Sequence, residues 1–158
     1  MVPNHAESIE EVRTEPLPVE QLRGNIPDII SFLLSLGYER VTVTYGFGCN
    51  LPIDRLWKPV ETHTGQLSAY IERSEQEGVF QLGRCDLHIE DAQNTLEFRL
   101  CHESDIHFAS TDRTLVEQAI ALWQKRGLVL YVSPGPKGSA GPMQWRRLEP
   151  SDQPVTGL

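Results

Sequence analysis

Three short segments between Gly83 and Ala109 alternate apolar and polar side chains, and this alternation constrains the fold more than any other feature. A period of two residues is typical of β-strands with one buried face. We therefore expect adjacent extended strands, with apolar side chains in the core and charged side chains toward water. The apolar positions are Cys85, Leu87 and Ile89, then Leu96, Phe98 and Leu100, then Ile106 and Phe108.

The polar side chains of the first two segments predict how these strands pair. If the hairpin turn lies at 92–93, His88 faces Glu97 and Asp86 faces Arg99. Opposite charges that face each other across two strands stabilise the pair by roughly 0.2–1 kcal/mol each. The charge pattern therefore supports an antiparallel hairpin independently of the apolar pattern.

Two segments have helical periodicity. In the first, at 25–36, Asn25 is a candidate N-cap and Pro27 fits the first turn, and Gly37 can end the helix. The second, at 112–126, can be capped by Thr111 or by Asp112. Each helix is followed by an apolar or β-branched segment that reads as a strand.

The sequence therefore predicts an α+β fold with a mainly antiparallel sheet of four to five strands packed by two helices. Segment 64–77 fits either a strand or a short helix, and its Glu- and Gln-rich end before Gly78 favours the helix. The expected strands are 39–45, 79–90, 94–101, 105–109 and 128–132, and the expected helices are 25–36 and 112–126.

The ends of the chain differ in composition from its centre. Residues 1–18 are acidic, contain three prolines and lack apolar periodicity, so we expect a mobile arm. Residues 133–158 contain five Pro and four Gly, which predicts a tail, with a short edge strand at 143–148. A single domain at 19–132 remains between them.

Composition restricts the partners and the compartment. The 158 residues carry a formal net charge of −8, which disfavours nucleic acid and suits a protein with a basic surface. No segment approaches the roughly 20 apolar residues of a membrane span, and the first residues lack the features of a secretory signal. Three cysteines are too few for a disulfide framework, so we expect a cytoplasmic protein.

Residues 101–107 hold the densest group of reactive side chains. Thiolate, imidazole and carboxylate are usual zinc ligands, but the neighbours Cys101 and His102 would point to opposite faces of a strand and could not act together. Cys49, in a glycine-flanked loop, is the better candidate for a reactive thiol. The sequence predicts no catalytic residue and no cofactor, and it leaves metal binding undecided.

The leading functional hypothesis is a non-catalytic, protein-binding module. Its partner surface is either the polar sheet face from Asp86 to Arg99 or the long connection 47–63 with Leu56 and Trp57. The first alternative is a ligand-binding domain or enzyme whose cleft is formed by 47–63 and 101–107, where His102, Glu103 and Asp105 are the binding candidates. The second alternative is a small metal-binding protein. Whether the protein is an enzyme stays open, with the absence of a catalytic motif favouring a binding role.

Overall fold

A computed structural model describes residues 10–133 and 145–149. In this part of the chain, eight strands form one antiparallel sheet in the order β3-β2-β4-β5-β6-β1-β7-β8. The α+β class is confirmed, whereas four to five strands was too few. The strands are β1 (Glu10–Thr14), β2 (Arg40–Tyr45), β3 (Val60–His63), β4 (Leu87–Glu90), β5 (Leu96–Leu100), β6 (Ile106–Ser110), β7 (Leu130–Val132) and β8 (Arg146–Arg147).

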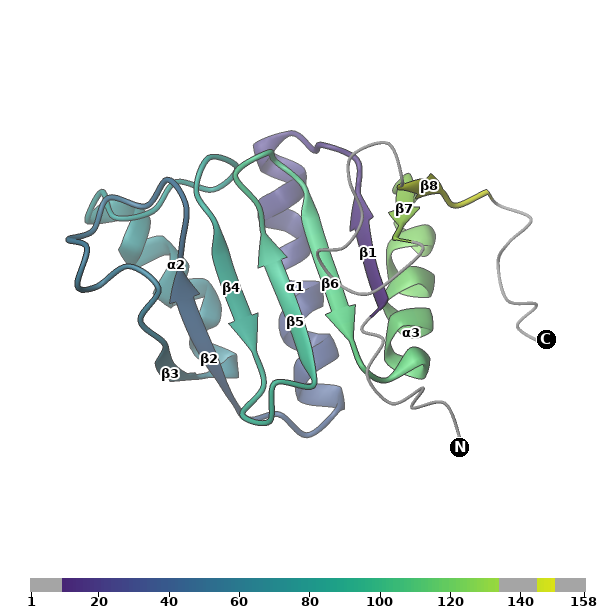
Figure 1. Ribbon diagram of the computed structural model, residues 1–158, viewed down its shortest axis with the longest axis horizontal. Coiled ribbons are helices and arrows are strands. Elements are labelled where there is room, and N and C mark those ends of the chain that lie inside the picture. Colours follow the sequence, from purple (N-terminus) through teal and green to yellow (C-terminus); the bar gives the residue numbers. More distant parts are fainter. Residues whose placement is uncertain (1–9, 134–144, 150–158) are drawn as a thin grey trace, which may run out of the picture.

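Three α-helices cover one face of this sheet, and the other face carries no helix among the described residues (Figure 1). The helices are α1 (Val19–Ser35), α2 (Leu67–Gln76) and α3 (Arg113–Lys125), with the short 3₁₀ helix η2 (Thr64–Gln66) leading into α2. The helical alternative for 64–77 is therefore confirmed. No helix in the described ranges is long and apolar enough to span a membrane.

The core lies between the helices and the apolar face of the sheet. Phe32 of α1 places its ring edge-on to the rings of Phe98 and Phe108, at centroid distances of 5.5 and 5.6 Å. Trp123 of α3 is fully buried and also places its ring edge-on to Phe98, at a centroid distance of 6.3 Å. The apolar positions predicted to face inward on β4, β5 and β6 are all buried, which confirms which face of the sheet is covered.

Helix α1 begins six residues earlier than the sequence indicated. It starts at Val19, directly after Pro18, and Leu22 extends its buried stripe toward the N-terminus. Asn25 is not the N-cap, because its side-chain amide donates to the backbone oxygen of Gln21 one turn back. An Asn that bonds to the preceding turn can stay inside a helix, and Pro27 is tolerated within it. Asp112 does cap α3, by accepting from the backbone N–H of Thr114.

The long strand predicted at 79–90 is a strand only from Leu87 onward. The residues before it form turns: the backbone N–H groups of Arg84 and Cys85 both donate to the oxygen of Gln81, and Gly83 has a positive φ of 88°. Gly83 adopts a left-handed conformation that an extended strand does not contain. The apolar–polar alternation before Leu87 therefore reflects which side chains are buried, although these residues do not pair as a β-strand.

The hairpin register is shifted by two residues from the predicted one. His88 faces Arg99, and Glu90 faces Glu97, because the connection is longer than a two-residue turn. The carboxylate of Asp91 accepts from the backbone N–H groups of Thr95 and Leu96 and fixes this connection. A shift of two residues leaves every side chain on its predicted face.

Strand β1 lies within the segment expected to be a mobile arm. It pairs with β6 on one side and β7 on the other, so it is an interior strand of the sheet. Val12 is fully buried, and the backbone N–H of Leu17 donates to the oxygen of Ser104. The arm prediction is therefore wrong for residues 10–18, and residues 1–9 lie outside the described part. Of the predicted edge strand at 143–148, β8 is observed, whereas 143 and 144 lie outside the described residues.

Candidate functional site

The helix-free face of the sheet carries charged side chains in rows that run across the strands. One row contains one residue from each of seven strands, and each of these residues faces the next one directly in the sheet. This row is rich in cationic side chains. A neighbouring row is acidic, with Glu90, Glu97 and Glu11 on three of these strands. The cation-rich row consists of Thr44, His88, Arg99, His107, Arg13, Tyr131 and Arg147.

Many of these charged side chains are buried, which the sequence did not predict. Glu11, Glu97, Asp105 and His107 are each at most 9% exposed. The expectation that the polar face points toward water is therefore wrong for its centre. In a sheet eight strands wide, a central charged side chain has charged neighbours on both sides, and Trp145 also lies against His107. Buried charges of this kind require partners, and the partners define the site.

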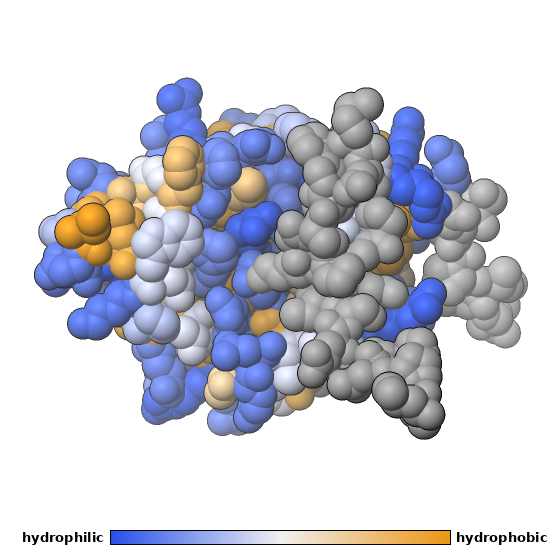
Figure 2. All heavy atoms as spheres, viewed as in Figure 1, coloured by the Kyte–Doolittle hydropathy of each residue, from blue (hydrophilic) through white to orange (hydrophobic). Residues whose placement is uncertain are grey.

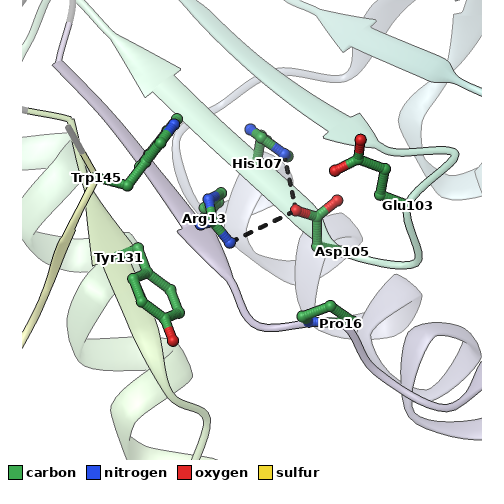
Figure 3. A pocket seen from close by; sticks show the side chains of 7 residues that line it. All are labelled: Arg13, Pro16, Glu103, Asp105, His107, Tyr131 and Trp145. Carbon is green, nitrogen blue, oxygen red and sulfur yellow. Dashed lines mark hydrogen bonds and ion pairs between the residues drawn. The ribbon is translucent and has the colours of Figure 1, made fainter. Parts of the chain in front are cut away.

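A pocket of about 470 Å³ opens on this face over β1, β6 and β7 (Figure 3). This volume is in the range of small-molecule binding sites. The described residues that line it are Arg13, Pro16, Glu103, Asp105, His107, Tyr131 and Trp145.

Arg13 lies against two aromatic rings in this pocket (Figure 3). The carbon of its guanidinium lies 4.4 Å from the ring centroid of Tyr131 and 4.9 Å from that of Trp145. Such cation–π contacts fix the plane of the guanidinium and leave its edge donors available. Among the described residues, Arg13 has one hydrogen bond, from Nη1 to the oxygen of Thr14, and one long ion pair, 3.9 Å from Asp105.

Asp105 and His107 form a buried pair at the floor of the pocket. Nε2 of His107 lies 3.1 Å from Oδ2 of Asp105, and Nδ1 lies 3.8 Å from Oε2 of Glu11. Burial lowers the pKa of His107, but the bonds with Asp105, Cys101 and Glu11 outweigh it and raise that pKa to about 10. Burial acts on Asp105 in the opposite sense, yet His107 and its other partners hold the pKa of this carboxyl below its usual value.

Arg99 opposes the protonation of His107. Its Nη2 lies 2.9 Å from Nδ1 of His107, a contact that is a hydrogen bond only while Nδ1 carries no proton. Its positive charge also lowers the pKa of His107. The two buried carboxylates outweigh this single guanidinium, so we conclude that the pKa of His107 is raised.

Three buried polar atoms on this face have no hydrogen-bond partner among the described residues. They are Oδ1 of Asp105, Nε of Arg99 and Nε2 of His88. Buried polar atoms without a partner are rare in native proteins, and a bound water or ion is one physical reason for them. Asn25 and Trp123, in the helices, have one such atom each. Asp105 is the most deeply buried of the three residues on this face and is the one that lines the pocket.

Cys101 lies beside the same floor. Strand β5 ends at Leu100, so Cys101 and His102 lie in a turn, and Sγ of Cys101 is 3.7 Å from Nδ1 of His102. The prediction that these two side chains cannot meet is therefore wrong. Among the described residues, three groups place potential metal-ligand atoms within 4.8 Å of one another: Asp86–Cys101–His102, Cys101–Asp105–His107 and His88–Glu90–Glu97.

The five residues predicted to bind fall in different places. Glu103 and Asp105 line the pocket, with Glu103 at its exposed rim. His102 lies beside it, bonded to Asp86 and in contact with the ring of Phe47 at 4.5 Å. That contact brings the segments 47–63 and 101–107 together, but no residue of 47–63 lines this pocket.

Leu56 and Trp57 lie at the other end of the same face. Leu56 is packed against the core, whereas Trp57 is 58% exposed with its ring beside His88. Trp57 has a positive φ of 64°, a conformation that bulky residues rarely adopt. Figure 2 shows hydrophobic side chains gathered at this end, where the loop between β2 and β3 lies. The exposed apolar residues of this loop include Phe47 and Ile53, and exposed Val60 begins β3.

Sequence reasoning missed Arg13, Tyr131 and Trp145. The alternation of Glu11 and Arg13 with Val12 and Thr14 was a strand signal, but the four residues are too few to distinguish a strand from an acidic arm. Cys49 is not an activated thiol: its Sγ donates to the backbone oxygen of Asp86, and burial raises its pKa to about 12.

Comparison with protein-family models, with curated proteins and with solved structures gave no significant match. The site must therefore be interpreted from its own geometry.

Proposed function

We propose that this protein is a binding domain for a small anionic ligand, held in the pocket between β1, β6 and β7. The observation that carries the proposal is Arg13, whose guanidinium lies against the rings of Tyr131 and Trp145 at the wall of this pocket. A planar guanidinium with available edge donors binds carboxylate or phosphate through two parallel hydrogen bonds.

The charges around the pocket support an anion. Asp105 is neutralised by His107 at 3.1 Å and lies 3.9 Å from Arg13. Glu103 is the other acidic residue of the lining, and its side chain is 72% exposed, so solvent screens it. The inner part of the pocket therefore favours negative charge, and the two aromatic rings provide an apolar wall for the rest of the ligand.

Calorimetric titration of the full chain with succinate and with inorganic phosphate tests this proposal and separates the two anion classes. We expect saturable binding of one of them, abolished in Arg13→Gln and weakened at least about tenfold in Arg13→Lys, which keeps the charge but loses the planar fork. Arg40→Gln is the matched control, because Arg40 is an exposed cation elsewhere on the sheet. Binding that Arg13→Gln leaves unchanged, or no binding of either anion, would contradict the proposal.

A second candidate function is protein binding through the loop between β2 and β3. The specific support is Trp57, which is exposed although its backbone is held in an unfavourable conformation. Such strain persists when the surrounding structure requires it and is concentrated at functional sites. The net charge of −8 suits a partner with a basic surface.

Trp57→Ala tests this candidate more cleanly than the double variant with Leu56→Ala, because Leu56 also supports the core. We expect partners captured by the full chain to be lost with Trp57→Ala and retained with Arg13→Gln. A captured protein must then bind purified chain saturably and reciprocally. Equal binding by the wild type and Trp57→Ala would remove this loop from consideration.

A further inference from the structure

We infer that Cys101, Asp105 and His107 form a binding site for a zinc-like divalent metal at the floor of the pocket. This inference builds on the proposed ligand site and adds a cation to it. The three residues supply one sulfur, one oxygen and one nitrogen ligand, which is a donor set that zinc accepts. All three residues are buried, so the ligands are held on the protein side of the pocket.

The spacing of the donor atoms suits a tetrahedral ion. Two nitrogen or oxygen ligands of a tetrahedral zinc lie about 3.3 Å apart, and a sulfur lies about 3.6 Å from a nitrogen. Nε2 of His107 and Oδ2 of Asp105 are 3.1 Å apart, and each of the three residues offers one potential ligand atom within 4.8 Å of those of the other two. Closing the set around an ion therefore requires side-chain movements of about an ångström.

An independent observation points to a missing ligand at this place. Oδ1 of Asp105 has no hydrogen-bond partner among the described residues, although the Asp105 side chain is only 3% exposed. A carboxylate oxygen that is buried and unpaired carries a large desolvation cost, and a bound cation removes it. Asp105 also lines the pocket, so a fourth coordination position can face the cavity.

The second ring nitrogen of His107 has a carboxylate nearby that can become its acceptor after a small movement. When Nε2 binds a metal, the remaining ring proton is on Nδ1, and Oε2 of Glu11 lies 3.8 Å away. A carboxylate that accepts from the outer nitrogen of a metal-bound histidine is a common orienting arrangement. Arg99 competes with it, because its 2.9 Å contact with Nδ1 stabilises the metal-free imidazole.

Binding of the metal and binding of the proposed anion then favour each other. When the metal binds, it displaces the thiol proton of Cys101 and the proton on Nε2 of His107, and both protons go to solvent. The open coordination position, next to the guanidinium of Arg13, can take one oxygen of a carboxylate or phosphate ligand. A site with three protein ligands and an open position is the arrangement of exchangeable or catalytic zinc rather than of a closed structural site.

Elemental analysis and Co²⁺ titration of the purified full chain test the inference. We expect about one zinc per chain as purified, and, after chelator treatment, the thiolate-to-cobalt charge-transfer band and strong visible bands of four-coordinate cobalt. Cys101→Ser should lose the charge-transfer band, and Asp105→Asn and His107→Gln should weaken cobalt binding at least about tenfold. Cys49→Ser and Cys85→Ser are matched controls that should keep the band, with folding of every variant checked by circular dichroism.

Three results would overturn the inference. One is a wild-type chain that contains no metal and gives no charge-transfer band. Another is a band that survives in folded Cys101→Ser. The third is a band lost in His102→Gln but kept in His107→Gln, which would place the ion with Asp86 instead. Arg13→Gln separates the two proposals, because it should abolish anion binding and keep the thiolate-to-cobalt charge-transfer band, since Arg13 supplies no ligand atom.

Discussion

The indole ring of Trp57 lies directly against Gly46: a β-carbon at residue 46 would come within 2.7 Å of two ring atoms and 3.2 Å of Nε2 of His88. Glycine at this position lets the ring lie over the end of β2 and beside β4. The backbone N–H of Trp57 donates to the oxygen of Tyr45 at 2.8 Å, which holds the left-handed residue in place. The position of the exposed Trp57 ring therefore depends on the absence of a β-carbon at residue 46.

Gly46→Ala should displace the ring of Trp57 without unfolding the protein. The far end of the half-exposed Trp57 side chain has to move and the His88 ring has to shift by a few tenths of an ångström, so we expect the free energy of unfolding to fall by less than about 1 kcal/mol. Fluorine NMR of fluorotryptophan-labelled protein measures the effect, and the resonance of buried Trp123 serves as the internal control. An unchanged Trp57 resonance would contradict the observed packing.

Asp91→Ala should destabilise the hairpin between β4 and β5 strongly. Asp91 is 1% exposed, and its carboxylate accepts from Thr95 N at 2.7 Å, Leu96 N at 3.0 Å and the Thr95 hydroxyl. Losing hydrogen bonds to a buried charged group should lower the free energy of unfolding by about 2–3 kcal/mol, measured by urea denaturation. Asn94→Gly, in the same turn, is the control.

Asn94 has a positive φ of 55°, which glycine adopts easily. We therefore expect Asn94→Gly to change the free energy of unfolding by less than about 0.5 kcal/mol. If Asp91→Ala were as mild as this control, Asp91 would not be the residue that sets the hairpin register.

Asp112→Ala should weaken the start of helix α3. The carboxylate of Asp112 accepts from the backbone N–H of Thr114 at 2.9 Å, and losing an N-cap costs about 1 kcal/mol. Asp112→Asn keeps an acceptor oxygen and should recover most of this stability. Thermal and urea denaturation of the three proteins would reveal the order, and equal stability of Asp112→Ala and the wild type would rule out a capping role.

Cys49 should react slowly with iodoacetamide in the folded protein. Burial raises its pKa from 9.0 to about 12, so near pH 8 the folded chain contains about a thousandfold less Cys49 thiolate than the unfolded chain. Because the raised pKa favours the neutral thiol in the folded state, its stabilising effect is complete below pH 9 and is lost as the pH rises from 9 to about 12.

Mass spectrometry of the alkylated peptides gives the labelling rate of Cys49 directly. We expect it to increase sharply when urea unfolds the chain. Cys49→Ala should also reduce the fall in stability between pH 9 and 12. Rapid labelling of Cys49 at pH 8 under native conditions would contradict its burial.

The sequence alone determined the faces of β4, β5 and β6, because a two-residue period survives any even shift of register. It also narrowed the N-cap of α3 to Thr111 or Asp112, of which the structure shows Asp112, and it predicted the left-handed end of the first helix at Gly37. These features depend on neighbours within a few residues along the chain, and local side-chain chemistry is sufficient to specify them.

The tertiary structure decided the register of the hairpin, the place of β1 and the composition of the pocket. Arg13, Asp105, Tyr131 and Trp145 are up to 132 residues apart in the sequence. They meet only because β1 is inserted between β6 and β7. The burial of His107 and Asp105 likewise follows from strands that the local pattern could not place, since the strand order of a sheet depends on contacts between distant segments.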